Sequence, residues 1–451
     1  MAMNSTVAII GAGLAGSEAA LVLSRNGISV ELYEARPEWS SPAHKTSLPA
    51  ELVCSNSLKA DQLPSAHGLL KAELSLLNSP LIMAARRNSV PAGSALAVDR
   101  ELFSRDVQSL LLGNQGIKYI CKEMDCAPAD RQYCIIAAGP LASDKLTFWL
   151  KNRFPSDTLH FYDAIAPIVQ TDSIDFSIAF RASRWEDGEG DYINCPFTED
   201  EYRNFYEALR DADRVNAREF ESEKFFEACL PVEISALRGF DALAYGPMRP
   251  VGLIDPRSGR RPYAVCQLRK ENASGSSYNL VGFQTRLTIP EQQNVFRLIP
   301  GLGNAEFLRY GSIHRNTYFD SPRLLSYDLS FREERNLFLA GQICGNEGYT
   351  ESIATGHLAA LFVISRIKGT TIENLPLNTA TGALLNHVLS SEIQPFTPSN
   401  VHFGLFPAFE HPTRKRIGKK EKKELICETA LQAFEKWKQG LMTNSGISIQ
   451  G

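Results

Sequence analysis

Six residues near the amino terminus form a turn that could bind a pyrophosphate. The turn has the spacing G-x-G-x-x-G and consists of Gly11, Ala12, Gly13, Leu14, Ala15 and Gly16. In such a turn the first glycine permits a sharp bend, the second lets backbone approach a pyrophosphate, and the third lets helix and strand pack closely. Eighteen residues later stands Glu34, whose carboxylate could accept hydrogen bonds from ribose hydroxyls. The spacing predicts a dinucleotide site, with a purely connecting glycine turn as the alternative.

A second glycine-rich segment is similar to the flavin-contacting segment of two-part FAD enzymes. An apolar run ends at Gly341 and is followed by Gln342, Gly345, Gly348 and a helical pattern over about 351–367. Many such flavoproteins carry an acid directly after the first of these glycines, where this chain has Gln342. An ordinary connection between a strand and a helix explains the pattern equally well. These residues alone therefore leave FAD and NAD open as the bound dinucleotide.

Two of the nine scattered cysteines are candidates for thiol chemistry. No C-x-x-C pair occurs, which disfavours zinc ribbons and disulfide frameworks, and we predict no metal site. Cys54 lies in a polar segment where Lys59 would favour the thiolate. Cys229 stands near Glu227 and Glu233, whose negative charges would disfavour its thiolate. From its neighbours alone, Cys229 is a buried apolar thiol rather than a nucleophile.

A dense basic cluster lies near the carboxyl terminus of a chain whose formal net charge is -4. It comprises Arg414, Lys415, Arg416, Lys419, Lys420, Lys422 and Lys423. Glu421 is the only acid among them, and an aromatic run that includes Phe406 precedes them. Because the protein as a whole is acidic, a nucleic acid would have to bind through such a local patch. A solvated helix face is the equally simple alternative.

The elements around the glycine turn predict an α/β fold. We expect apolar strands at Thr6–Ile10, Ile28–Tyr33, Tyr133–Ala137 and Asn336–Ala340, with a helix over Leu14–Arg25. A strand, a glycine turn, a helix and a second strand are the start of a doubly wound parallel sheet. The sequence therefore predicts a Rossmann-like nucleotide-binding domain.

The middle of the chain has a different character. Residues from about 156 to 325 are rich in aromatics, charges and strand-turn patterns, and they contain a charged helical stretch at Glu199–Glu227. We predict that 156–325 form an inserted α+β domain for substrate or RNA. Residues 1–155 and 326–451 would then be the two parts of the nucleotide-binding domain, the second with the basic tail.

The composition is that of an ordinary soluble globular protein. Of the 451 residues, 44% are hydrophobic and 22% are charged. No apolar run reaches the roughly 18–20 residues that span a bilayer. Met1–Thr6 carries no basic region typical of a signal peptide. With its unpaired thiols, the chain is expected in a reducing cytoplasm, with no membrane association.

Long phrases of the sequence carry a more specific resemblance. In chain order they are GAGLAGSEAA (11–20), ELVCSNSLKAD (51–61), VPAGSALAVDRELFS (90–104), EACLPVE (227–233), YGPMRPVGL (245–253), YNLVGFQTRL (278–287), FRLIPGLGNAEFLRYGSIHRNTY (296–318), LFLAGQICGNEGYTESIATG (337–356) and HFGLFPAF (402–409). They run from end to end in the order expected of one family. The chain thus resembles the folate- and FAD-dependent tRNA uracil-5-methyltransferases, the TrmFO family.

The resemblance implies FAD as cofactor, NADH or NADPH as electron donor, 5,10-methylenetetrahydrofolate as carbon donor and a T-loop uridine of tRNA as substrate. It implies that Cys229 attacks carbon 6 of the uracil, which activates carbon 5, and that Cys54 is its partner as a base or a guard. A base must later remove the proton from carbon 5. His314 and Arg315 could hold folate or a flavin edge, and Glu351 with its neighbour Glu347 could hold pterin nitrogens.

Other functions remain open from the residues alone. A relative could perform the same chemistry on a uridine of ribosomal RNA. A larger family of tRNA-modifying flavoproteins shares the glycine turn but lacks the ACLPVE and HFGLFP phrases. A plain FAD oxidoreductase would need neither the basic cluster nor a nucleophilic thiol, and an RNA-binding protein could keep FAD as a structural element.

Overall fold

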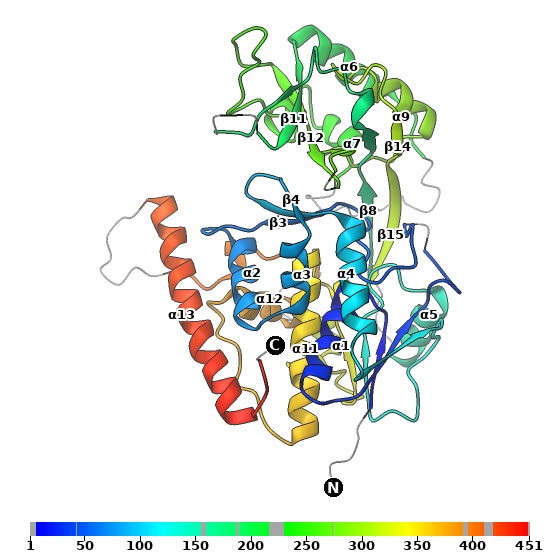
Figure 1. The fold of residues 1–451 in the computed structure, drawn as a ribbon, viewed down its shortest axis with the longest axis vertical. Helices are drawn as coiled ribbons and strands as arrows, with labels where there is room; N and C mark the ends of the chain where they lie inside the picture. Colours follow the sequence, from blue (N-terminus) through cyan, green and yellow to red (C-terminus); the bar gives the residue numbers. More distant parts are fainter. Residues whose placement is uncertain are drawn as a thin grey trace.

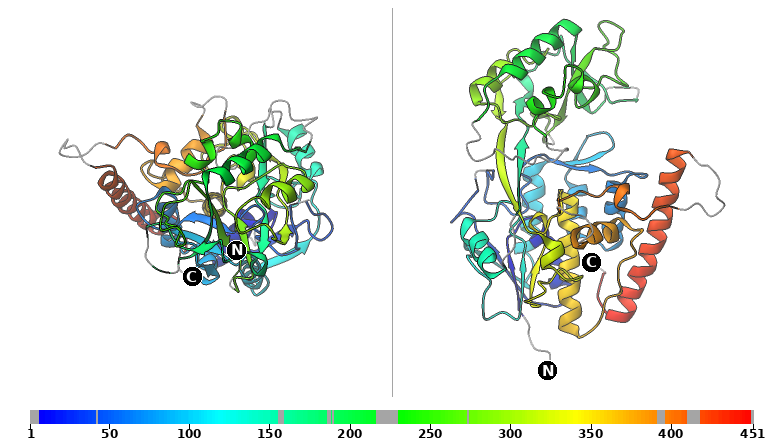
Figure 2. Two further views of the ribbon diagram at one scale, coloured as in Figure 1. Left: turned by 90° about the horizontal axis from the view of Figure 1, so that it is seen from above. Right: turned by 180° about the vertical axis from the view of Figure 1, so that it is seen from behind.

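The computed structural model describes residues 6–41, 43–154, 159–185, 188, 190–215, 230–272, 274–390, 396–409 and 418–449, with backbone alone at 159–165 and 313–316. A larger part built on a parallel sheet carries both ends of the described chain, and a smaller part lies above it (Figure 1). Two long strands connect the parts, as the view from behind also shows (Figure 2).

The larger part is organised around a five-stranded sheet. Its strands, in spatial order, are β16 (Leu337–Leu339), β7 (Tyr133–Ile136), β1 (Val7–Ile10), β2 (Val30–Glu34) and β6 (Ile117–Cys121). All four pairings are parallel. From β1 the chain passes to β2 on one side, whereas β7 and β16 lie on the other, and such a switch point opens a crevice at the carboxyl ends of the strands. The predicted Rossmann-like α/β fold is confirmed.

The helices that follow the two glycine segments pack against each other at the centre of this part (Figure 1). They are α1 (Leu14–Arg25) and α11 (Tyr349–Lys368), and residues 350–365 of α11 are all buried. A buried contact of 2.7 Å between His357 Nδ1 and Glu18 Oε1 also links them. The position of both glycine segments is therefore fixed by one helix pair.

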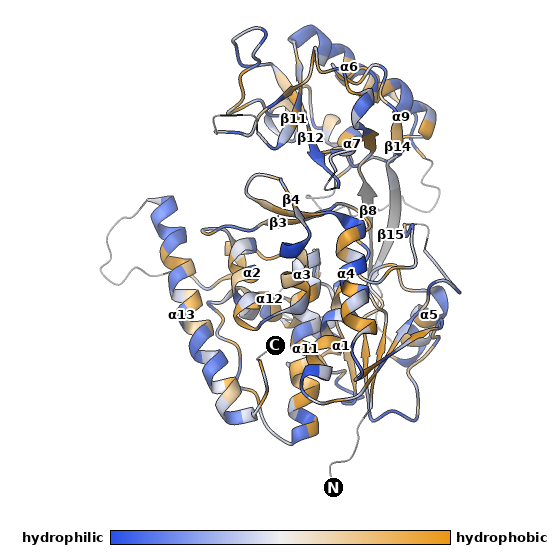
Figure 3. Ribbon diagram, in the orientation of Figure 1, coloured by the Kyte–Doolittle hydropathy of each residue, from blue (hydrophilic) through white to orange (hydrophobic). Residues whose placement is uncertain are grey.

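Other helices and a small sheet surround this centre. The helices are α2 (Ala66–Leu76), α3 (Pro80–Arg87), α4 (Arg100–Leu112), α5 (Asp144–Arg153), α10 (Ser321–Leu324), α12 (Ala380–Leu389) and α13 (Lys419–Ser445), with short 3-10 turns at η3 (Gln342–Cys344) and η4 (Phe403–Leu405). The small antiparallel sheet has the order β3 (Ser57–Ala60), β5 (Ala95–Val98), β4 (Ser89–Val90). The central strands are hydrophobic, whereas the upper end of α13 is hydrophilic (Figure 3).

The smaller part has its own sheet and core. Its antiparallel strands have the order β10 (Phe180–Arg181), β11 (Tyr192–Phe197), β12 (Ala264–Lys270), β13 (Ser277–Leu280), β9 (Ile168–Gln170) and β14 (Phe307–Arg309). Its helices are η1 (Thr171–Ser173), α6 (Glu199–Asp211), α7 (Val232–Ala236), α8 (Ala242–Tyr245) and α9 (Ile289–Phe296). The core contains Phe197, Tyr202, Phe205, Phe283 and Phe296. An antiparallel sheet with helices confirms the predicted α+β class.

The connection between the parts is a pair of antiparallel strands, β8 (Leu159–Ile165) and β15 (Ser312–Tyr318). All strands of the smaller part lie between β8 and β15 in the sequence, so the chain leaves along one strand and returns along the other. The predicted domain boundaries at 155/156 and 325/326 stay predictions.

The helix predicted at Glu199–Glu227 is wrong in its extent. The helix ends at Asp211, and Ala212 already has an extended backbone. The N–H of Val215 then donates to the carbonyl of Arg286 at 2.9 Å, because the chain runs beside that segment. Residues 216–229 lie outside the described part.

Within the described residues, no helix is long and apolar enough to cross a bilayer. The same residues contain no group of three or more His, Cys, Asp or Glu side chains arranged to hold a metal ion.

Candidate functional site

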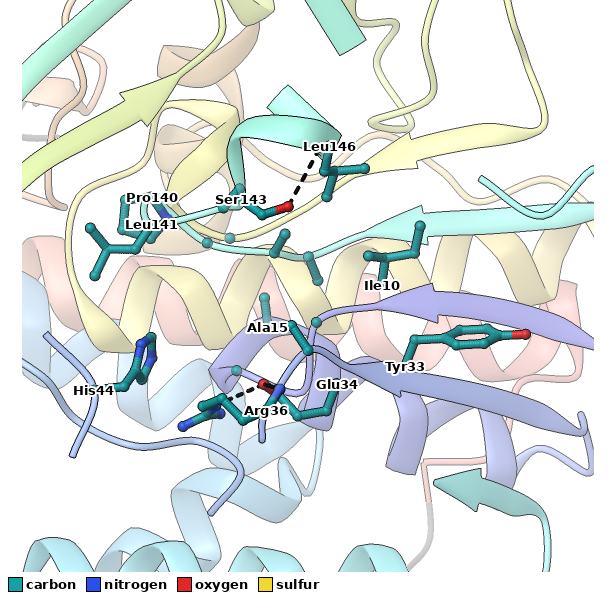
Figure 4. Close-up of a pocket in the computed structure, with 18 of the residues that line it drawn as sticks. Ile10, Ala15, Tyr33, Glu34, Arg36, His44, Pro140, Leu141, Ser143 and Leu146 are labelled. Carbon is teal, nitrogen blue, oxygen red and sulfur yellow. Dashed lines mark hydrogen bonds and ion pairs between the residues drawn. The ribbon is translucent and has the colours of Figure 1, made fainter. Parts of the chain in front are cut away.

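A pocket lies at the carboxyl ends of the central strands, against the glycine turn (Figure 4). The empty space inside it is about 1040 Å³, including its open mouth. Seven of the ten residues predicted to bind the cofactor line it: Gly11, Gly13, Leu14, Ala15, Glu34, Gly341 and Gln342. Ala12, Gly16 and Gly345 lie outside its lining. The structure thus brings the two glycine segments, far apart in sequence, to one pocket.

The glycine turn has the geometry that its spacing predicts. Gly11 has a φ of +103°, and a Cβ at Gly16 would lie 1.9 Å from the carbonyl oxygen of Gly11. Both positions therefore need glycine for the fold itself. A Cβ at Gly13 would meet no atom within 4 Å, so the backbone there faces open space. A ligand can approach that backbone closely, next to the amino terminus of α1.

Glu34 lines the pocket beside the glycine turn. Its Oε2 accepts the N–H of Ala12 at 3.1 Å, and its Oε1 accepts the Arg36 backbone N–H at 3.1 Å and Nε at 2.7 Å. Burial opposes ionisation, yet the hydrogen bonds and charge of Arg36 hold the pKa of Glu34 below its ordinary value. A carboxylate has about four acceptor positions, so room remains for a ribose hydroxyl. Sequence reasoning missed Arg36, although its position two residues after Glu34 was a usable signal.

The second glycine segment contributes two of its three predicted residues to the pocket. Gly341, with a φ of +82°, and Gln342 line it. Gly345 instead makes room for an aromatic ring, because a Cβ there would lie 2.4 Å from Cε1 of Phe396. Tyr349, at the start of α11, also lines the pocket.

A thiol lies against Tyr349, a residue that lines the pocket, although Cys54 itself is not part of the lining. The Tyr349 hydroxyl accepts the backbone N–H groups of Cys54 at 2.9 Å and Ser55 at 3.2 Å, and it lies 2.9 Å from Sγ of Cys54. Because two donors already occupy the oxygen lone pairs, its own proton points to the sulfur. Burial and the charge of Cys54 raise the pKa of Tyr349 well above its ordinary value, so the hydroxyl stays a donor. A sulfur that accepts a hydrogen bond is stabilised as a thiolate.

Cations from both parts of the molecule interact with Cys54. They include Arg100, Arg269 and Arg309. Lys59, the cation expected beside Cys54, interacts with Glu351 instead. Burial of Glu351 would raise its pKa, but the hydrogen bond from His67 and the charge of Lys59 lower it below its ordinary value. Sequence reasoning missed the three arginines, which no local spacing connects to Cys54.

The glutamate predicted to hold a pterin has other contacts. Glu351 is buried, its Oε1 accepts the N–H of Val401 at 3.0 Å, and it does not line the pocket. The second such candidate, Glu347, is also buried and outside the lining. Their proposed contact with folate gains no support from this geometry.

Several predicted functional residues lie outside what the structure describes. These are Cys229, Arg414, Lys415 and Arg416, together with the side chains of His314 and Arg315. The neighbouring Glu233 is buried, and its carboxylate accepts the Thr285 hydroxyl at 2.8 Å and the Arg286 N–H at 2.9 Å. Burial raises the pKa of Glu233.

The remaining basic residues form the exposed start of a long helix. Lys419, Lys420, Lys422 and Lys423 occupy the first turns of α13. Lys423 Nζ lies 5.9 Å from the ring centre of Phe403. Positive side chains are unfavourable at the amino terminus of a helix, whose unpaired N–H groups already attract anions. Glu421 is the acid in the first turn of this helix.

Known proteins match this chain over nearly its whole length. The model of the family described as "Glucose inhibited division protein A" (GIDA) matches residues 6–371. A protein from Myxococcus xanthus (strain DK1622) is 50% identical over 450 residues, which cover 99% of this chain and 96% of the relative. One from Koribacter versatilis (strain Ellin345) is 48% identical over 436 residues, covering 96% and 98%. Both are named methylenetetrahydrofolate–tRNA-(uracil-5-)-methyltransferase TrmFO.

Solved structures share the fold at low sequence identity. Aquifex aeolicus GidA in its form I crystal has a TM-score of 0.69 at 15% identity, and the match covers 97% of this chain and 76% of that one. The form II crystal gives a TM-score of 0.68 at 14% identity.

Proposed function

The chain belongs to the GidA family and to the TrmFO methyltransferases, and we propose that it transfers a one-carbon unit from 5,10-methylenetetrahydrofolate to carbon 5 of a uridine in the T-loop of tRNA. The family resemblance read from the sequence is thereby confirmed. One observation carries the proposal: Tyr349, which lines the proposed dinucleotide pocket, also contacts the thiol of Cys54 at 2.9 Å. A substrate beside Tyr349 would lie between a cofactor and a reactive sulfur.

FAD is the dinucleotide that we propose for the pocket. The open backbone at Gly13, the amino terminus of α1 and the carboxylate of Glu34 suit a pyrophosphate and a ribose. Gly341 and Gln342, which adjoin Ala15 of the glycine turn, and Tyr349 would contact the rest of the cofactor. When bound, FAD supplies the two electrons, drawn from NADH or NADPH, that reduce a one-carbon unit from the formaldehyde level to methyl.

Two thiols would divide the work on the uracil. Cys229 is proposed as the nucleophile that adds to carbon 6, which makes carbon 5 reactive toward the one-carbon unit. Cys54 is proposed as its partner, which holds or accepts a proton at Sγ. The hydrogen bond from Tyr349 and the nearby arginine charges support this role, because both stabilise a sulfur anion. Elimination of the first thiol then restores the pyrimidine.

The RNA would be held by positive charge outside the pocket. The exposed lysines at the start of α13 support contact with phosphates, and we propose that Arg414, Lys415 and Arg416 extend this surface. The target base must leave its stack in the folded T-loop before it reaches Cys54. A tRNA substrate is also the reason to place the enzyme in the cytoplasm.

Two alternatives need a direct test. The first is another tRNA-modifying flavoprotein. The fold is shared with Aquifex aeolicus GidA, but the identity to that protein is 15%, against 50% to a TrmFO relative. A ribosomal RNA uridine would suit the same chemistry.

The test is transfer of labelled carbon. The purified protein is expected to be yellow and, with NADH or NADPH, to move label from 5,10-methylenetetrahydrofolate into 5-methyluridine of unmodified tRNA. A ribosomal RNA fragment serves as the competing substrate. A colourless protein, or label in the ribosomal fragment alone, would contradict the proposal.

A further inference from the structure

Three arginines meet where the larger and smaller parts of the molecule approach each other. Arg100 begins α4 in the larger part, whereas Arg269 on β12 and Arg309 at the end of β14 belong to the smaller part. Each interacts electrostatically with Cys54. We call these three residues the arginine cluster.

Two members of the cluster are fixed by hydrogen bonds. Arg100 donates to the carbonyl of Leu52 at 2.8 Å and lies 2.8 Å from the carboxylate of Glu271. Arg269 donates through Nε to the side chain of Asn56 at 3.0 Å. Asn56 is buried and in turn donates to the carbonyl of Lys270 at 2.8 Å. Both guanidinium groups therefore have defined positions on either side of the segment that carries Cys54.

The third member has no partner of its own. Within the residues that the structure describes, the side chain of Arg309 makes no hydrogen bond and no ion pair, although it is only partly exposed. Burial and then the like charge of Arg100 lower the pKa of Arg309. Glu271 is the acid that pairs with the cluster in this described part, so three cations face one carboxylate. An unpaired, partly buried cation costs stability unless an anion binds it.

The location of the arginine cluster indicates which anion binds there. Tyr349 lines the pocket and contacts Cys54. Arg100 and Arg269 bond to Leu52 and Asn56, two residues before and after Cys54, and Arg309 interacts electrostatically with the same thiol. A nucleotide carries its phosphate one sugar away from its base, so a base held at Cys54 places that phosphate against the nearest surface. Guanidinium groups bind phosphates through paired N–H donors. The carboxylates of a folate tail have the same charge but sit on a long chain that can leave by the pocket mouth.

We infer that the arginine cluster is an oxyanion subsite that binds the RNA phosphate next to the target uridine. The inference rests on the proposed function, because it requires an RNA substrate at Cys54. It assigns Arg309 to the substrate rather than to the fold.

Arg309→Gln tests this assignment, with Arg203→Gln as the matched control. Arg203 is an exposed cation on α6, the helix at the top of Figure 1, and it pairs with Glu199 at 3.2 Å. We expect Arg309→Gln to weaken tRNA binding about tenfold and to lower the slope of log affinity against log salt by about one. Its melting temperature should not fall, since no partner is lost. Arg309→Lys should keep the salt slope, because it keeps the charge.

Binding of tetrahydrofolate, measured on the same variants, separates the two sources of anion. Unchanged folate affinity with weaker tRNA binding supports the inference. Weaker folate binding with unchanged tRNA binding overturns it, and so does Arg309→Gln behaving like Arg203→Gln. Failure of the wild-type protein to bind or methylate tRNA would instead refute the proposed function.

Discussion

The glycine turn of the pocket and the surroundings of Cys54, which we call the glycine end and the cysteine end, are built in different ways. At the glycine end, one turn and one carboxylate make the surface, and the N–H of Ala12 bonds Glu34 only 22 residues away. At the cysteine end, side chains from distant segments converge, and the residues that bond, Cys54 and Tyr349, are 295 positions apart. At the glycine end each carboxylate has a cationic partner, since Arg36 lies between Glu34 and Glu51. The cysteine end carries an excess of positive charge.

This difference is the one expected between a site for a permanently bound cofactor and a site for a substrate that binds and leaves. A surface of backbone atoms and paired side chains is complete and stable before any ligand arrives. An unbalanced cluster of side chains is unfavourable until its substrate supplies the missing charge. The contrast predicts that changes at the glycine end alter cofactor binding and stability, whereas changes at the cysteine end alter chemistry with the fold intact.

The largest effect is expected from Cys229→Ala. Loss of the proposed nucleophile should reduce methyl transfer at least about a thousandfold, while flavin absorbance of the purified protein stays unchanged. Cys121→Ala, which removes an exposed thiol on β6, is the control. Full activity in Cys229→Ala would remove this residue from the mechanism.

Tyr349→Phe tests the hydrogen bond to the second thiol. The change removes the donor to Cys54, so we expect slower alkylation of that thiol at pH 7 and methyl transfer reduced about tenfold to a hundredfold. Tyr327→Phe is matched, because the Tyr327 hydroxyl also accepts a backbone N–H, that of Leu375 at 2.6 Å. Equal loss of activity in both variants would mean that stability, not the thiol, is affected.

Two glycines of one turn should respond in opposite ways. Gly16→Ala forces a Cβ onto the carbonyl of Gly11 and should reduce the free energy of unfolding by about 3 kcal/mol. Gly13→Ala meets no atom, so the melting temperature of the apoprotein should hold while FAD affinity falls. Thermal unfolding measures the stability of both variants, and flavin titration measures their affinity for FAD. A Gly13→Ala variant with full FAD affinity would contradict the proposed approach of a pyrophosphate.

Neutralising Lys419, Lys420, Lys422 and Lys423 together changes charge outside both ends of the pocket. We expect tRNA binding about tenfold weaker and a flatter salt dependence, with the cofactor still bound. Lys436→Gln with Lys438→Gln, further along α13, gives a control on the same helix. If the salt slope is unchanged, the four lysines form a solvated helix face and do not bind RNA.

Glu34→Gln should have the smallest effect and a defined pH dependence. The folded pKa of Glu34 is lowered, so its ionised form stabilises the fold above the ordinary value of 4.5, and this contribution is lost as the pH falls. The variant should be about 1 kcal/mol less stable at pH 7 and should approach the wild type in acid. Glu101→Gln, at an exposed position on α4, is the control. A difference in stability that grows toward low pH would contradict this role.

The same contrast explains what the sequence could predict. The glycine turn, Glu34 and the parallel strands follow from short spacings, because each contact there is local or repeats along one element. Tyr349, Arg100 and Arg309 were missed because tertiary packing alone brings them to Cys54. Gly345 illustrates the intermediate case: its spacing fits a cofactor segment, but the ring that occupies the space beside it comes from Phe396. The end of α6 at Asp211 likewise depends on a neighbouring segment, at residues 286–287.

The central claim is that a thiol of this chain bonds to a pyrimidine held beside the cofactor. The most direct measurement incubates the protein, 5,10-methylenetetrahydrofolate and NADH or NADPH with unmodified tRNA that contains 5-fluorouridine, because fluorine at carbon 5 blocks the final loss of a proton. We predict a covalent RNA–protein adduct whose peptide maps to Cys229. Absence of any adduct, from a protein that methylates ordinary tRNA under the same conditions, would contradict the account.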